Sequence, residues 1–263
     1  DLKVMTFNIK NANPTTENAW DTRRPILART IERHNPDLIG TQEGFFFQIK
    51  HMLNDLPQYD WVGLGRAGGS KDEMMAILYK KDRFEVIAFD HFWLSDTPEI
   101  IGSRTWGHDN RRMLTWVRFK DIETGTEFYL WNTHFDHRVQ EAREKSATLI
   151  LRRIREITPK APIILMGDFN AAPDNPAHAT LVSNMPGEVN LSDTWTIAEE
   201  RGGDGIGTFN RWRGPQEGAA RIDWILVSPE ITCKKIQIDT YHENNQYPSD
   251  HFPVIADISI NEN

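Results

Sequence analysis

Two segments of the chain place a carboxylate and a hydrogen-bonding side chain at the end of an apolar run. Asp168 and Asn170 come directly after the apolar run 162–166. Asp250 and His251 come just before another apolar run near the C-terminus. Short apolar runs of this kind predict buried strands, and loops at strand ends are where α/β proteins build active sites. Carboxylates, an amide and an imidazole in such loops indicate hydrolytic chemistry on a phosphate.

Three further runs end in the same way. The run 2–8 ends in Asn8, the run 37–43 ends in Glu43, and the alternating run 128–134 ends in His134. Asp136 and His137 follow within three residues of His134. The sequence therefore predicts that several strands bring polar side chains to one active site.

Five motifs carry a resemblance to a known family: Phe7-Asn8, Gln42-Glu43, Asn132-Thr133-His134, Gly167-Asp168-Phe169-Asn170 and Ser249-Asp250-His251. In this order they resemble the motif set of the endonuclease/exonuclease/phosphatase superfamily of metal-dependent phosphoesterases, in a bacterial-type member. The resemblance runs from about residue 2 to residue 258. It implies an α/β fold, a four-layered α/β/β/α sandwich of two mostly antiparallel sheets flanked by helices, with the site at one edge.

The periodicity of the sequence agrees with this fold. Helices are expected over 23–35, 45–56 and 141–157, where apolar residues recur at helical spacing. Further strands are expected over 61–64, 74–79, 84–93, 114–119, 127–132, 221–227 and 235–239. A hairpin is expected around Gly125. We expect one domain over 1–263, since no linker-like segment divides the chain.

Composition and charge limit the substrates and surroundings that suit the protein. The 263 residues carry a net charge of −8, which disfavours a tight grip on long nucleic acid. No run of 18 apolar residues is present in the sequence, and its one cysteine, Cys233, is expected to be a buried thiol. The chain begins at Asp1 without a methionine, which predicts that either a signal peptide or a tag has been removed; export to the periplasm or outside the cell, with the leader removed, is the favoured alternative. We also expect a soluble monomer.

The reaction calls for a divalent metal with oxygen ligands. Glu43 is the expected main ligand, with Asn8 and Asp250 beside it directly or through water. The expected ion is Mg²⁺, with Mn²⁺ as an alternative. Asp168 is expected to accept the proton of the attacking water, and Asn170 is expected to hold that water and the phosphoryl oxygen.

His134 and His251 are expected to stabilise the transition state, each with a carboxylate partner. Asp223 lies in an otherwise apolar strand, where an unpaired charge is costly. The resemblance implies that Asp223 pairs with His134 and Glu73 with His251. The alternative pairing of Asp223 with His251 stays open. Asp136, two residues beyond His134 in the sequence, is expected to support the site.

The sequence gives fewer indications of which residues contact the substrate. Arg112 is expected to contact the phosphate, with Arg211 as a second basic residue. Trp106 and Trp212 are expected to stack on a sugar or base, although core packing explains most of the nine tryptophans.

These observations predict a Mg²⁺-dependent phosphodiesterase or phosphatase that prefers a small or terminal phosphoester, such as a sugar phosphate, a nucleotide or a nucleic-acid end. The first alternative is a nuclease acting on DNA or RNA. The second is a catalytically silent module that binds a phosphorylated ligand or a protein on the same scaffold.

Overall fold

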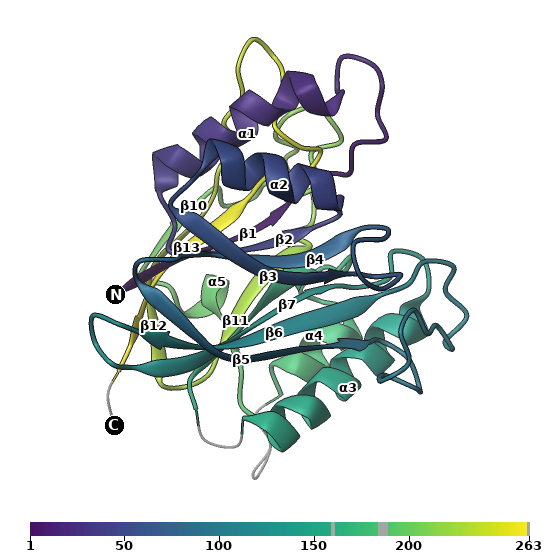
Figure 1. Cartoon of the computed structure of the whole chain (residues 1–263), viewed down its shortest axis with the longest axis vertical. Coiled ribbons are helices and arrows are strands. Elements are labelled where there is room, and N and C mark those ends of the chain that lie inside the picture. Colours follow the sequence, from purple (N-terminus) through teal and green to yellow (C-terminus); the bar gives the residue numbers. More distant parts are fainter. Residues whose placement is uncertain (159–160, 184–188, 262–263) are drawn as a thin grey trace.

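The computed structural model describes residues 1–158, 161–183 and 189–261, and these form four layers (Figure 1). Two sheets pack face to face, and helices cover the outer face of each. Both sheets are mixed: β1 and β2, β7 and β8, and β10 and β12 run parallel, while the other paired strands are antiparallel. The predicted sandwich is confirmed.

The first sheet has the order β10-β12-β13-β1-β2-β4-β3. Its strands are β1 (Leu2–Asn8), β2 (Leu38–Gln42), β3 (Tyr59–Gly65), β4 (Met74–Lys80), β10 (Glu200–Gly202), β12 (Ile231–Ile238) and β13 (Val254–Ile260). Helices α1 (Trp20–His34) and α2 (Phe46–Asp55) cover its outer face.

The second sheet has the order β5-β6-β7-β8-β11-β9. Its strands are β5 (Phe84–Trp93), β6 (Met113–Asp121), β7 (Glu127–His134), β8 (Ile163–Asp168), β9 (Ser192–Asp193) and β11 (Asp223–Val227). Helices α3 (Gln140–Ile157) and α4 (Pro176–Leu181) cover it, and the short helix α5 (Thr194–Ile197) follows β9.

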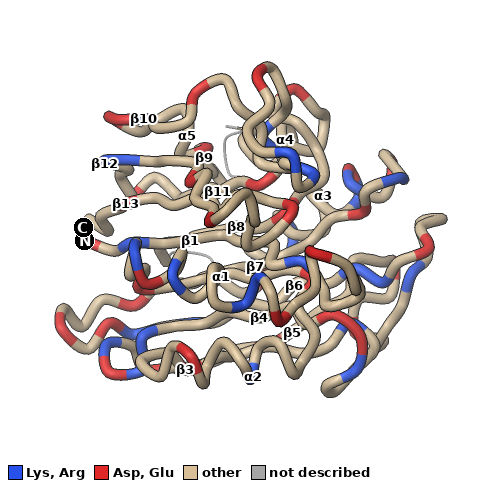
Figure 2. Tube along the Cα trace, turned by 90° about the horizontal axis from the view of Figure 1, so that it is seen from above, with Lys and Arg blue, Asp and Glu red and all other residues tan. Residues whose placement is uncertain are grey.

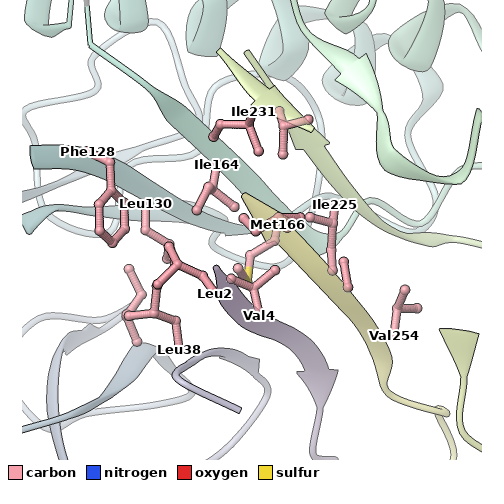
Figure 3. Close-up of a cluster of buried hydrophobic side chains, with 14 of the residues drawn as sticks. Leu2, Val4, Leu38, Phe128, Leu130, Ile164, Met166, Ile225, Ile231 and Val254 are labelled. Carbon is pink, nitrogen blue, oxygen red and sulfur yellow. The ribbon is translucent and has the colours of Figure 1, made fainter. Parts of the chain in front are cut away.

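Burial follows the sequence pattern. The central core lies between the sheets, where Val4, Leu38, Leu130, Ile164 and Val254 meet (Figure 3). The apolar stripe of α3 packs on the second sheet, and that of α1 packs on the first. Strands in the middle of both sheets are covered on both faces, which explains their near-continuous apolar runs.

The three long helices lie within three residues of their expected bounds. The short elements β9, α5 and β10 were not predicted, because two to four residues carry too little periodicity. Strand β12 was predicted to begin at Lys235 but begins at Ile231, since a bulge between Cys233 and Lys235 interrupts its alternation. The predicted strand 221–227 begins only at Asp223.

Buried polar contacts fix the two sheets against each other close to the strand ends. The Nε2 of Gln42 donates to Oδ1 of Asn132 at 2.7 Å, and Nδ2 of Asn132 donates to the carbonyls of Thr41 and Ala76 at 2.9 Å. A side chain at Gly40 would place its Cβ 2.8 Å from Oδ1 of Asn132. These contacts set how the edges of the two sheets meet.

Among the described helices, none combines the length and hydropathy that crossing a membrane requires.

Candidate active site

The expected site residues gather because of strand direction. Asn8 and Gln42 pair across the parallel strands β1 and β2, so Asn8 and Glu43 leave the sheet at the same edge. In the second sheet, His134 and Asp223 both lie opposite Asp168 in register. Carboxyl ends of parallel strands and amino ends of antiparallel neighbours meet at one edge, which explains the convergence.

Gly167 allows β7 and β8 to come together at this edge. A Cβ at this position would lie 2.1 Å from the carbonyl oxygen of Thr133. Only glycine permits that approach, which brings His134 and Asp168 side by side.

Asp168 is buried and surrounded by donors. Its Oδ2 accepts from Nδ2 of Asn8 at 2.9 Å, and its Oδ1 accepts from the backbone N–H of Asn170 at 2.9 Å. Burial, together with the nearby Asp223 carboxylate, raises the pKa of Asp168 to about 7. A carboxyl group with that pKa suits a general base at neutral pH.

Asp223 pairs with His251, not with His134. Its Oδ2 lies 3.0 Å from Nδ1 of His251, and Nε2 of His251 lies 3.7 Å from Oδ2 of Asp168. Burial opposes the charge on His251, but Asp223 and Asp168 outweigh it and raise the pKa of His251 to about 10. The pairing that the resemblance implied is therefore wrong for both histidines, and the alternative pairing is confirmed.

The reason lies in strand order and in the other contacts of Glu73. Residue 223 begins β11, the strand beside β8, and its carboxylate meets the ring of His251, which lies in the loop before β13. Glu73 instead forms an ion pair with Arg66 at 2.6 Å and accepts from Nδ2 of Asn11 at 3.1 Å. Burial, followed by repulsion from Glu43, raises the pKa of Glu73.

His134 lies against the general base. Its Nε2 is 3.4 Å from Oδ2 of Asp168. Burial and the nearby Arg112 guanidinium hold the pKa of His134 well below its usual value. His134 is therefore a neutral imidazole, which donates a hydrogen bond without adding charge.

Glu43 and Asp250 share one cation. Nζ of Lys10 lies 3.2 Å from Oε2 of Glu43 and 3.6 Å from Oδ2 of Asp250. Oε1 of Glu43 accepts from Nδ2 of Asn8 at 3.0 Å. Burial works against the charge of Glu43, yet Lys10 and Asn8 keep its pKa below the usual value. Lys10 was not predicted as a site residue.

This arrangement fits a divalent metal. Glu43 and Asp250 already converge on the Lys10 ammonium, so they can converge on a metal ion, with Asn8 beside them. Asp168, Asp223 and His251 also place ligand atoms within 4.8 Å of one another. Asp223 is already paired with His251 at 3.0 Å, whereas Glu43 and Asp250 already hold a cation, so the Glu43 side is the better metal position.

Arg112 lines the same cavity as Asp168 and Glu43. Its side chain is 5 % exposed, its Nε lies 3.7 Å from Asp136 and one terminal nitrogen lies 3.2 Å from Nδ1 of His137. Asp136 also accepts from the backbone N–H groups of Arg138 and Val139 ahead of α3. Asp136 therefore supports Arg112.

Arg66 is a second basic residue that sequence analysis missed. It follows β3, binds Glu73 as above and lies 3.0 Å from Asp72 through its Nε. Nothing local in the Gly-rich segment 65–72 indicates a site. Arg66 meets Glu73 only in the folded chain, and the sequence gives no sign of this contact.

The remaining substrate-side predictions lie away from these residues. Trp106 is 8 % exposed and donates from Nε1 to Asp96 at 2.8 Å, in a separate surface cavity beside α3. Trp212 stacks on Arg23 at 5.6 Å, and Arg211 stacks on Phe209 at 5.2 Å. None of these three predicted substrate residues lines the cavity that holds Asp168, whereas Phe209 does.

That cavity has a volume of about 330 Å³. Its walls carry both charge signs and are formed by Lys10, Asn11, Glu43, Arg66, Glu73, Asn110, Arg112, His134, His137, Asp168, Asn170, Phe209, Ile222, Asp250 and His251. Over the described chain, acidic and basic residues are intermingled and are not gathered into one basic face (Figure 2).

Asn170 adopts a left-handed backbone conformation, with φ of 47°, at the mouth of β8. Its Nδ2 donates to the carbonyl of Phe135 at 3.0 Å. This contact orients the side-chain amide beside Asp168, where its carbonyl oxygen and second N–H are available to water or phosphate.

Comparisons with known proteins find similar chains over most of the sequence. The chain is 34% identical to mannosyl-6-phosphatase of Bacteroides thetaiotaomicron VPI-5482, with a TM-score of 0.92 over 99% of this chain and 100% of that structure. It is 30% identical to the uncharacterized protein L388 of Acanthamoeba polyphaga mimivirus over 64% of this chain and 67% of that protein. Nocturnin of Drosophila melanogaster is 21% identical over 99% of the chain, which spans about half (47%) of that protein.

The Endonuclease/Exonuclease/phosphatase family profile matches residues 5–251. The family generally depends on a divalent metal, and its members support a phosphoesterase activity here. The fold, the converging strand ends and the profile match agree, and the chain belongs to the Endonuclease/Exonuclease/phosphatase family.

Proposed function

We propose that this protein hydrolyses a small or terminal phosphoester in a reaction that depends on Mg²⁺ or Mn²⁺. The side chain of Arg112 carries the proposal. It is almost wholly buried, and two of its nitrogens, Nε and one terminal nitrogen, have no hydrogen-bond partner among the described residues. A buried guanidinium with free donors beside Asp168 and His251 is suited to bind a phosphate.

The size of the cavity supports a small substrate. Its volume of about 330 Å³ lies at the lower end of the roughly 300–1,000 Å³ that ligand sites occupy. The net charge of −8, and the acidic and basic residues intermingled along the trace in Figure 2, disfavour binding of long polyanions. Lys10, Arg66 and Arg112 give the cavity enough positive charge for one phosphate group.

Asp168 supplies the base of the proposed mechanism. With a pKa of about 7, it accepts the proton of a water molecule aimed at phosphorus. Asn170 holds that water in line with the leaving oxygen. A neutral amide suits this place because a second anion would repel the phosphate.

The two histidines act on the phosphoryl oxygens in different charge states. His251, protonated and held by Asp223, donates a charged hydrogen bond that stabilises the growing negative charge. Neutral His134 donates a further hydrogen bond and leaves the net charge beside Asp168 unchanged.

Glu43, with Asp250 and Asn8 beside it, would hold the metal ion. Once bound, such an ion polarises a phosphoryl oxygen and stabilises the leaving alkoxide.

A sugar phosphate is the first substrate to test. The likeness to mannosyl-6-phosphatase, at 34% identity over nearly the whole of both chains, supports a sugar phosphomonoester. Glu73, Asn110 and Arg66 line the cavity and offer donors and acceptors for hydroxyl groups.

The test is a turnover screen with the purified chain and Mg²⁺. Its substrates are hexose 6-phosphates, nucleotides, and single- and double-stranded DNA and RNA, with Asp168→Asn as the inactive control. We expect phosphate release from a sugar phosphate and little cleavage of the polymers. Faster cleavage of DNA or RNA would establish the nuclease alternative, and no turnover of any substrate would favour a silent binding module.

A further inference from the structure

A wholly buried arginine lies behind the active site. Arg23 is in the first turn of α1, and its side chain has 0% exposure. A buried guanidinium is costly unless every N–H group finds an acceptor. The contacts of Arg23 show how this cost is offset.

All five N–H groups of Arg23 have backbone acceptors. Nε donates to the carbonyl of Asn18 at 2.9 Å. One terminal nitrogen donates to Ile9 at 2.7 Å and to Pro248 at 3.0 Å. The other donates to Lys10 at 2.8 Å and to Asn11 at 2.9 Å. The planar fork of arginine matches five fixed acceptors, which the three donors of lysine cannot do.

These acceptors belong to segments that carry site residues. Ile9, Lys10 and Asn11 follow Asn8 directly, and Pro248 comes two residues before Asp250. Oγ of Ser249 also donates to the carbonyl of Asn8 at 2.6 Å. Arg23 thus holds the loop after β1 against the loop before β13, far apart in sequence.

A third loop is tied to the same arginine. The guanidinium carbon lies 5.2 Å from the ring centroid of Trp20 and 5.6 Å from that of Trp212. Asn210, two residues before Trp212, donates from its backbone N–H to the carbonyl of Asp250 at 2.8 Å. Trp212 thereby covers Arg23 on the side of the loop 208–212.

We propose that Arg23 is a positioning residue: by holding the 9–11 and 248–251 loops together, it sets the spacing of Asn8 and Glu43 relative to Asp250 and His251. Its buried positive charge also offsets the negative charge of Glu43 and Asp250, since burial lowers the pKa of Arg23 only to about 10 and it stays protonated at neutral pH. The proposal rests on the proposed function for the role of these groups.

The test compares Arg23→Lys and Arg23→Gln with the same substitutions at Arg24. Arg24 is the next residue of α1, and its guanidinium binds Asp55 at 2.7 Å on the outer side of the helix. The first readout is the affinity for Mn²⁺, by electron paramagnetic resonance titration. The second is kcat and KM on the best substrate of the screen. Circular dichroism gives the folded fraction of each variant, and kcat is expressed per folded molecule.

We expect both Arg23 variants to bind Mn²⁺ about tenfold more weakly, as is typical when a residue that orients metal ligands is changed. Their kcat should fall by a similar factor while KM changes less. The Arg24 variants should lose only thermal stability. Wild-type Mn²⁺ affinity and kcat in a folded Arg23→Lys protein would overturn the proposal.

Trp212→Ala provides the second variant if the Arg23 variants do not fold. It exposes the guanidinium to water without removing it, and we expect Mn²⁺ affinity to fall about threefold, less than the tenfold range for a removed orienting group. Unchanged Mn²⁺ affinity in this variant would overturn the proposal. A wild-type protein without phosphoesterase activity would refute the proposed function alone, because Mn²⁺ binding is measured without substrate.

Discussion

Oδ2 of Asp223 lies 3.0 Å from Nδ1 of His251, and the other ring nitrogen of this histidine faces Asp168 at 3.7 Å. His251 is thus an imidazolium between two buried carboxylates, with its pKa raised to about 10. The same carboxylates repel each other, which helps to raise the pKa of Asp168 to about 7. One arrangement therefore produces both the acid and the base that in-line hydrolysis needs.

Asp223→Asn should lower kcat by about 100-fold or more, within the range for removing one acid–base partner. An amide cannot stabilise the imidazolium of His251, so the charged donor to the phosphoryl group is lost. Steady-state kinetics on the best substrate of the screen measures the effect. KM should change little, because Asp223 does not line the cavity.

Asp193→Asn is the matched control. Oδ2 of Asp193 lies 2.9 Å from Nε2 of His178 and 2.6 Å from Arg221, so this variant also breaks a buried Asp–His pair, but outside the cavity. We expect a lower melting temperature and unchanged kcat per folded molecule. Equal losses of kcat in both variants would mean that Asp223 acts only through stability.

Strand ends explain why much of the site could be predicted from sequence. Asn8, Glu43, His134, Asp168 and His251 each stand next to a strongly apolar run, and strand direction brings such ends to one edge. The pairing of each histidine with its carboxylate could not be predicted in this way. Which carboxylate reaches which histidine depends on strand order across two sheets, and sequence spacing does not encode that order.

Residues that act across loops were missed for a related reason. Lys10 and Arg66 lie in segments without periodicity, and only the folded chain brings them to Glu43 and Glu73. Sequence analysis predicts that Trp106 stacks on a sugar or base. In the structure its indole packs among apolar side chains and donates to Asp96 instead.

Glu43→Gln should bind Mg²⁺ at least about tenfold more weakly, because a neutral amide is a poor ligand for a hard cation. Isothermal titration with MgCl₂ measures this directly, and turnover should be nearly lost. Glu73→Gln is the control, since Glu73 lies in the same cavity but is held by Arg66. Its Mg²⁺ affinity should be that of the wild type. The metal assignment fails if Glu43→Gln keeps full affinity, or if excess chelator leaves the wild type active.

Lys10→Met should bind Mg²⁺ more tightly than the wild type. The Lys10 ammonium lies within 3.6 Å of both Glu43 and Asp250, where it neutralises the carboxylates that a metal would use. Removing it strengthens the local negative field, and an increase of at least about threefold is expected for charges this close. Lys71→Met, at an exposed position on the β3–β4 loop, should leave the affinity unchanged. Weaker binding in Lys10→Met would show that Lys10 orders the site instead of competing with the metal.

Arg112→Ala should raise KM by about tenfold or more, because a buried guanidinium makes strong charge-assisted bonds to phosphate. The slope of log affinity against log salt should also become shallower by roughly 0.7 to 0.9, the contribution of one phosphate contact. Arg111→Ala is the neighbouring control, with a side chain that is 39% exposed and 3.9 Å from Asp72. Unchanged KM and slope in Arg112→Ala would remove the residue on which the proposed function depends.

The burial of His91, away from the active site, predicts that the free energy of unfolding falls in acid. Burial lowers its pKa to about 4, and its Nδ1 lies 2.9 Å from Oγ1 of Thr115. In the unfolded chain a histidine takes up its proton near pH 6.5, so the folded state binds fewer protons between pH 6.5 and 4 and loses stability as the pH falls through that window. Above pH 7 both states are neutral at this position, and the contribution is constant.

His91→Gln removes this proton uptake. Its free energy of unfolding should therefore fall less than that of the wild type between pH 6.5 and 4, by about 1–3 kcal/mol, with no pH-dependent difference above pH 7. Urea unfolding at several pH values, followed by circular dichroism, measures it. His242→Gln changes an exposed histidine and should follow the wild-type curve. The curves of His91→Gln and the wild type could instead stay parallel down to pH 4. In that case His91 takes up its proton in the folded protein as readily as in the unfolded chain, and its place beside Thr115 must admit water.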